Sequence, residues 1–142
     1  MAEMKRLCTA APDALVAGLT AAAVSALPST LTAVATGTDP LEATVAAGSI
    51  VLPHEQRRER LIAAAVPIHV TLSLGWASVL SRVLPRRRTV AAGAFAGLII
   101  AALDLGVVGR RFPRIRALPL LPQLADHVIY GATVGWVLAR RR

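Results

Sequence analysis

The chain contains an apolar run of 21 residues, Thr89–Gly109, that lies between two clusters of arginine. At about 1.5 Å per helical residue the run is roughly 31 Å long, which matches the hydrocarbon core of a bilayer. The run therefore predicts a transmembrane helix. Asp104 interrupts its apolar character, and a carboxylate at membrane depth is costly enough to require a partner within the protein.

The composition agrees with a membrane protein. Hydrophobic residues make up 55% of the 142 residues and the mean hydropathy is +0.59, more than a soluble domain of this size needs for its core. The net charge of +8 does not indicate nucleic-acid binding, because the arginines flank the apolar runs and no aromatic stacking surface accompanies them. We therefore expect one polytopic membrane domain, residues 1–142, in contact with lipid headgroups.

Four apolar segments predict an all-α membrane protein, a four-span transmembrane helical bundle with spans at 14–36, 61–84, 89–109 and 122–139. We expect Pro28 to kink the first span. A short helix, Pro40–Leu52, should follow it, with Asp39 as its N-cap. This helix is too short to cross a bilayer, so both an interfacial and a re-entrant position are open.

Three further interpretations concern the chain as a whole. The first apolar segment is alternatively a signal peptide cleaved near Ala33–Ala35, although Asp13 at its start argues against that. Spans two and four share a His followed by Gly-Trp, so a duplicated hairpin is a second alternative. With both termini inside, the inside carries nine basic residues and the outside seven, a small bias toward cytoplasmic termini.

Polar residues of three spans are expected to meet in one half of the membrane. Asp104 lies about 8 Å from the end of its helix, His127 about 8 Å from the start of the fourth, and His69 about 12 Å from the start of the second. These ends are on the same side of a four-span bundle. The expected intramembrane polar cluster is His69, Asp104, Asp126, His127 and Tyr130.

Two Gly-x-x-x-Gly pairs predict close helix packing. Gly93 and Gly97 share the face of Asp104, while Gly131 and Gly135 share the face of His127. Small residues at this spacing let membrane helices approach closely. We therefore expect the third and fourth spans to pack through their glycines.

The polar cluster has three interpretations. In the structural one, Asp104 accepts hydrogen bonds from His69, His127, Tyr130 or Arg111 and so fixes helix register. In the second, a carboxylate and imidazoles form a proton- or ion-linked path. In the third, His69, His127 and Asp104 bind a metal, although no helical His-x-x-x-His spacing supports it. We expect no metal and no cofactor.

Sequence motifs of enzymes are absent. The chain has no Gly-rich phosphate loop, no Gly-x-Ser-x-Gly and no paired cysteines, and Cys8 is its only cysteine. The basic linker RRFPRIR is either a solvated topogenic loop or a site for anionic lipid headgroups, formed by Arg110, Arg111, Arg114 and Arg116. We expect no enzyme.

Several stretches carry a resemblance to known proteins. They are LPSTLT with TGTDPLEATVAA, LSLGWASVLSRVLPRRR, and AALDLGVVGRRFPRIRALPL with ADHVIYG. Together they resemble a group of small actinobacterial integral membrane proteins of unknown function. The resemblance implies the plasma membrane of a GC-rich bacterium and brings no activity with it.

Three functions remain open. The leading hypothesis is a non-enzymatic structural or interaction protein of the plasma membrane, with lipid and a second copy or another membrane protein as partners. The alternatives are a small oligomeric transporter or channel subunit that uses the His/Asp site, and a membrane-embedded metal or redox protein.

Overall fold

The computed structural model of the chain describes the backbone of residues 2–141 and the side chains of residues 11–141. This part of the chain contains helices and no strand, so the all-α prediction is confirmed. The α-helices are α1 (Ala2–Val24), α2 (Leu27–Thr36), α3 (Glu42–Gly48), α4 (Arg58–Val83), α5 (Thr89–Leu103), α6 (Pro113–Ala117) and α7 (Leu120–Arg141). A π-helical turn, Asp104–Val108, and a 3-10 turn, Gly109–Arg111, connect α5 to α6.

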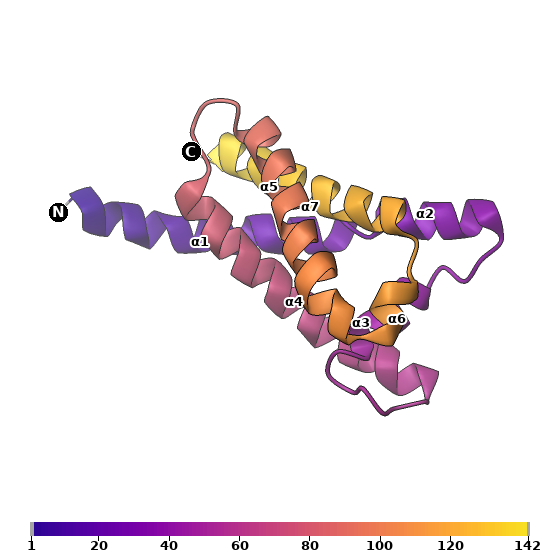
Figure 1. Ribbon diagram of the computed structural model, residues 1–142. Coiled ribbons are helices and arrows are strands. Elements are labelled where there is room, and N and C mark those ends of the chain that lie inside the picture. The colour runs from indigo at the N-terminus through magenta and orange to yellow at the C-terminus, as the bar shows by residue number, and fades with distance from the viewer. Residues whose placement is uncertain (1, 142) are drawn as a thin grey trace.

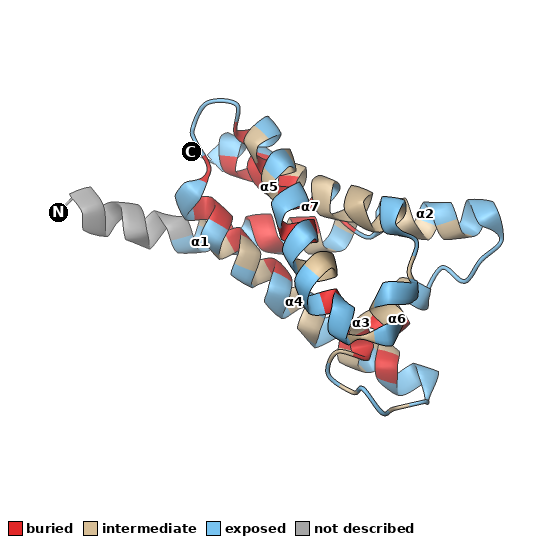
Figure 2. Ribbon diagram, viewed as in Figure 1, coloured by how far each residue is buried: buried red, intermediate tan, exposed pale blue. Residues whose placement is uncertain are grey.

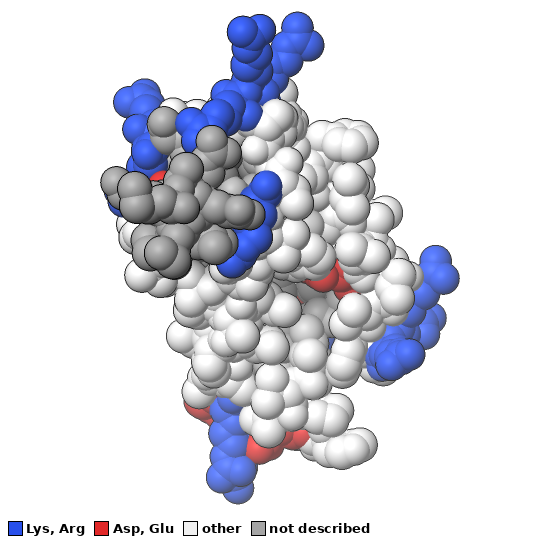
Figure 3. Space-filling model, turned by 90° about the vertical axis from the view of Figure 1, so that its left-hand side faces the viewer, with Lys and Arg blue, Asp and Glu red and all other residues white. Residues whose placement is uncertain are grey.

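Within the described chain, three helical segments are long and apolar enough to cross a membrane: Ala11–Thr36, Arg58–Val83 and Thr89–Arg111. The predicted fourth span, α7, has a comparable length of 22 residues. Its first half carries Gln123, Asp126 and His127, which lower its hydropathy. Figure 3 shows basic side chains gathered at the top, the bottom and the right-hand edge of this face, and acidic atoms in one hollow.

The most extensive interface joins α5 and α7, which cross at close range (Figure 1). Its glycines bring backbone against backbone. A Cβ atom on Gly97 would lie 2.1 Å from the carbonyl oxygen of His127, and one on Gly93 would lie 2.2 Å from that of Gly131. Real Cβ atoms essentially never approach another heavy atom within 3.0 Å, so only glycine fits these positions.

Helix α1 packs against both α4 and α7. Ala17, Ala21 and Ala77 are fully buried where these helices meet, and the buried faces of the four long helices point toward one another (Figure 2). At the end of the molecule where α7 finishes, the Arg141 guanidinium donates to the Asp13 carboxylate over 2.8 Å. The packing therefore ties the start of the described chain to its end.

The first apolar segment is broken rather than kinked at the expected place. Its helix stops at Val24, a turn at Ser25 and Ala26 follows, and α2 then continues beyond α1 (Figure 1). The kink predicted at Pro28 is therefore wrong in position, because Pro28 occupies the first turn of α2, where its missing N–H group costs nothing. Among the described side chains, α2 contributes none to the buried core (Figure 2).

The short helix after the first span is shorter than predicted. Helix α3 covers Glu42–Gly48 instead of residues 40–52, and its N-cap is Leu41, so the prediction of Asp39 as N-cap is wrong. Asp39 instead accepts a hydrogen bond from the Leu41 N–H group in the turn before the helix. The helix packs against α4, where a Cβ atom on Gly48 would lie 1.9 Å from the Leu61 carbonyl oxygen. The sequence pattern had not indicated this close contact.

An ion pair holds the loop beside α3. The Arg58 guanidinium donates to Asp39 over 2.8 Å, and this bond, together with the Leu41 N–H group, keeps the pKa of Asp39 below its usual value. A carboxylate with a lowered folded pKa stabilises the fold above its unfolded pKa and loses that contribution as the pH falls through the folded value. Because Asp39 is exposed, the contribution is small.

Candidate functional site

The break in the first apolar segment frees backbone groups inside the bundle. The last four carbonyls of α1 and the first four N–H groups of α2 have no partner within their own helices unless a turn supplies one. The Ser25 N–H group bonds to the Ala21 carbonyl and the Thr30 N–H group to that of Ala26. Side chains of two other helices bond to further groups at these ends.

His69 on α4 bonds to the end of α1. Its Nε2 atom lies 3.0 Å from the carbonyl oxygen of Ala22, in the last turn of α1. A carbonyl only accepts, so the Nε2–H group of His69 must be the donor. An imidazole at the C-terminal end of a helix also interacts favourably with the helix dipole. His69 therefore contributes to the site by capping a helix from a neighbouring one.

Asp126 on α7 bonds to the beginning of α2. Its Oδ1 atom accepts a hydrogen bond of 2.9 Å from the backbone N–H group of Ser29, which lies in the first turn of α2. A carboxylate at this position satisfies a free donor and lies at the positive end of the helix dipole. The two sides of the break are thus held by α4 and α7.

His127 on α7 lies beside Asp104. The Nε2 atom of His127 is 3.5 Å from Oδ2 of Asp104, and both side chains are partly buried. The other ring nitrogen, Nδ1, lies 2.8 Å from the Gln123 carbonyl oxygen and must therefore donate its hydrogen. Nε2 is therefore the ring nitrogen that faces the Asp104 carboxyl group, at a distance longer than a usual hydrogen bond.

Asp104 is also the first residue of the π-helical turn. The N–H group of Gly109 bonds to the carbonyl of Asp104, five residues earlier. This turn therefore contains one residue more than an α-helical turn. π-Helical turns are rare in proteins, and those that occur are often found at functional sites. The predicted span Thr89–Gly109 is thus one helical segment, Thr89–Arg111, whose winding changes from α to π at Asp104.

Tyr130 connects α7 to α4. Its hydroxyl group donates to the Ser73 carbonyl, and the side chain is 6% exposed. Asp104 lies within electrostatic range of this phenol, and His69 within range of Asp126. The described structure brings Asp104 into direct contact with His127 alone among the four expected partners, His69, His127, Tyr130 and Arg111.

The fully buried polar side-chain atoms are hydrogen-bonded within the chain. Among the described residues, no buried side-chain nitrogen or oxygen lacks a hydrogen-bond partner. The His, Cys, Asp and Glu side chains of this part of the chain form no group of three or more that could hold a metal ion. The arrangement can therefore brace helices, while its donor set does not fit the metal interpretation.

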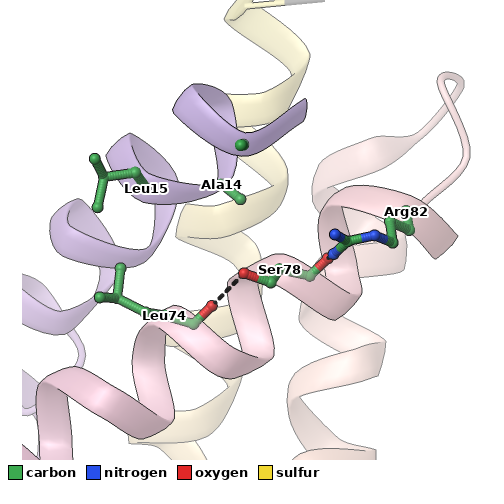
Figure 4. A pocket seen from close by; sticks show the side chains of 6 residues that line it. Ala14, Leu15, Leu74, Ser78 and Arg82 are labelled. Atoms are coloured by element: carbon green, nitrogen blue, oxygen red, sulfur yellow. Dashed lines mark hydrogen bonds between the residues drawn. The ribbon is translucent and has the colours of Figure 1, made fainter. Parts of the chain in front are cut away.

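A cavity of about 240 Å³ lies elsewhere, between α1 and α4. Its lining is Ala11, Ala14, Leu15, Leu74, Ser78 and Arg82, and the Arg82 guanidinium bonds to the Ser78 carbonyl at its rim (Figure 4). None of the five residues of the predicted polar cluster lines it. This hollow is separate from the site.

Sequence reasoning missed the groups that bond to His69, Asp126 and Tyr130. Two of these partners are backbone carbonyls and one is a backbone N–H group, for which side-chain patterns give no signal. Ser29 itself gave no signal in the sequence, because the bond uses its backbone N–H group and not its side chain.

Comparison with protein-family models, curated proteins and solved structures found no match to this chain. The resemblance to actinobacterial membrane proteins therefore stays a prediction, and the functional argument rests on the geometry.

Proposed function

We propose that the chain is a four-span integral protein of the bacterial plasma membrane with a non-enzymatic structural or interaction role. The first span is the broken pair α1 and α2, followed by α4, by α5 with its π-helical turn, and by α7. Lipid is its first partner, and a second copy or another membrane protein is the second.

The packing of α7 supports the fourth crossing. Helix α7 contacts α1, α2 and α5, so it runs along the length of the bundle (Figure 1). Its polar first half bonds to other helices through Asp126, His127 and Tyr130, which lowers the cost of placing those groups in a membrane. It ends in Arg140 and Arg141, which suit lipid headgroups.

The observation that carries the structural role is the use of the polar side chains. His69 and Asp126 bond to the two ends of a broken helix, and Tyr130 bonds to the backbone of α4. Helices in lipid have little hydrophobic reason to associate, so such bonds fix their register. Because these side chains bond to the backbone of neighbouring helices, the cluster supports a role in holding the helices together rather than in catalysis.

A second candidate function is a small proton-linked transporter or channel subunit. Discontinuous helices with capped ends, such as α1 and α2, are typical of transporter binding sites. The π-helical turn at Asp104 and the proximity of its carboxyl group to the His127 imidazole favour it further. This candidate needs movement of a proton along the pair, which the structural role does not.

Substitution of Asp104 by asparagine distinguishes the two functions. We expect a modest loss of thermal stability, because the Asn amide can still donate to Nε2 of His127. Substitution by leucine removes the polar contact between residue 104 and Nε2 of His127 and should destabilise more strongly. The measurement is thermal unfolding in detergent, paired with proton flux into vesicles that contain a pH-sensitive dye.

The structural role predicts that vesicles with the parent protein take up protons no faster than empty vesicles. A flux that the parent supports and the asparagine variant abolishes, with the fold retained, would contradict it and establish the transporter function.

A further inference from the structure

We infer that Arg110, Arg111, Arg114 and Arg116 form a binding site for the headgroups of anionic phospholipids. This inference rests on the proposed membrane position of the chain, and it assigns a ligand class to the linker between α5 and α7.

The four arginines differ from three other arginines of the chain, whose side chains form ion pairs. Arg58 pairs with Asp39, Arg60 with Glu55 and Arg141 with Asp13. Within residues 11–141, no hydrogen bond, ion pair or ring contact joins any of the four linker side chains to another group. Four cations without an internal anion favour an external one.

The linker is folded before any lipid binds. A Cβ atom on Gly109 would lie 2.7 Å from the side chain of Ile115, so the 3-10 turn packs tightly against α6. Backbone bonds from Phe112 to Gly109 and from Arg116 to Phe112 close successive turns. Little conformational freedom is then lost when a headgroup binds, which favours affinity.

Apolar side chains accompany the charges. Leu120 is 60% exposed and Leu121 is 78% exposed, and both follow the linker directly. Arg110, Arg111 and Arg116 are exposed, and Arg114 is partly buried. Four arginines followed closely in the chain by exposed leucines fit a lipid, whose phosphate accepts paired hydrogen bonds while its acyl chains cover apolar surface. A soluble phosphate matches the charges alone.

The test measures thermal stabilisation of the full-length protein in neutral detergent on titration with short-chain phosphatidylglycerol. We expect a concentration-dependent rise in the unfolding temperature that short-chain phosphatidylcholine and glycerol phosphate do not produce. Changing the four arginines to glutamine should weaken the apparent affinity roughly tenfold or more. A matched variant, Arg87→Gln with Arg88→Gln at the opposite end of the bundle, should keep most of the affinity.

Two pairs, R110Q with R111Q and R114Q with R116Q, serve if the fourfold variant does not fold, and each should lose part of the affinity. An equal response to both lipids, or equal affinity of parent and variants, would overturn the lipid site. An alkaline carbonate wash of membranes distinguishes failure of the lipid site from failure of the proposed membrane function. Release of the parent from the membrane would contradict the proposed membrane function, whereas retention would leave only the lipid site refuted.

Discussion

Replacing Gly97 by alanine should destabilise the protein by about 1–3 kcal/mol or more, and replacement by leucine should prevent α5 and α7 from packing. The added Cβ atom would lie 2.1 Å from the His127 carbonyl oxygen, a backbone atom that cannot move without separating the helices. The free energy of unfolding in mixed micelles measures the effect.

Gly75 provides a matched control within another long helix. Among the described atoms, nothing lies within 4 Å of a Cβ atom built on it. Gly75→Ala should therefore be neutral or stabilise by up to about 1 kcal/mol, because alanine loses less backbone freedom than glycine when a helix forms. Equal unfolding free energies for Gly97→Ala and the parent would mean that the α5–α7 contact is looser than described.

Replacing Asp126 by alanine should release the beginning of α2. The Ser29 N–H group would lose its acceptor in a low-dielectric region, a loss of about 1–3 kcal/mol. We therefore expect amide hydrogen exchange in Leu27–Thr36 to accelerate roughly 5- to 150-fold, while exchange in α5 changes little. Hydrogen exchange read by mass spectrometry on peptides of α2 tests this.

Asp126→Asn is the corresponding control, because its amide oxygen can still accept the Ser29 hydrogen bond. Exchange in α2 should then stay close to that of the parent. If exchange is equally fast in Asp126→Ala and Asp126→Asn, the cause is the loss of the charge at the helix N-terminus and not the loss of the hydrogen bond. Unchanged exchange in the alanine variant would refute the cap.

The helical segments were predictable from the sequence because apolar length and flanking charge determine them. Thr89–Gly109 satisfied both criteria, and the glycine spacing in α5 and α7 indicated which faces could approach. The contribution of Gly48 was not visible, since a single glycine in a short helix has no repeating partner.

Other features depend on tertiary contacts. The break at Ser25 precedes Pro28 because His69 and Asp126 satisfy the freed backbone from other helices, and a local pattern does not contain that information. The π-helical turn at Asp104 likewise depends on the contact with His127 and on the packing of Gly109. A prediction from sequence periodicity assumes regular helical turns, so it does not detect the break at Ser25 or the π-helical turn at Asp104.

Four crossings are the central claim, and site-directed labelling in vesicles of uniform orientation tests it. Each protein carries Cys8→Ser and one new cysteine, at Thr38, at Arg87, at Ala117 or after Arg142, and meets a maleimide that cannot cross the membrane. We predict that Thr38→Cys and Ala117→Cys react from one side, and Arg87→Cys and the added terminal cysteine from the other. Reaction of the terminal cysteine from the same side as Ala117→Cys would show that α7 does not cross, which would contradict the four-span account.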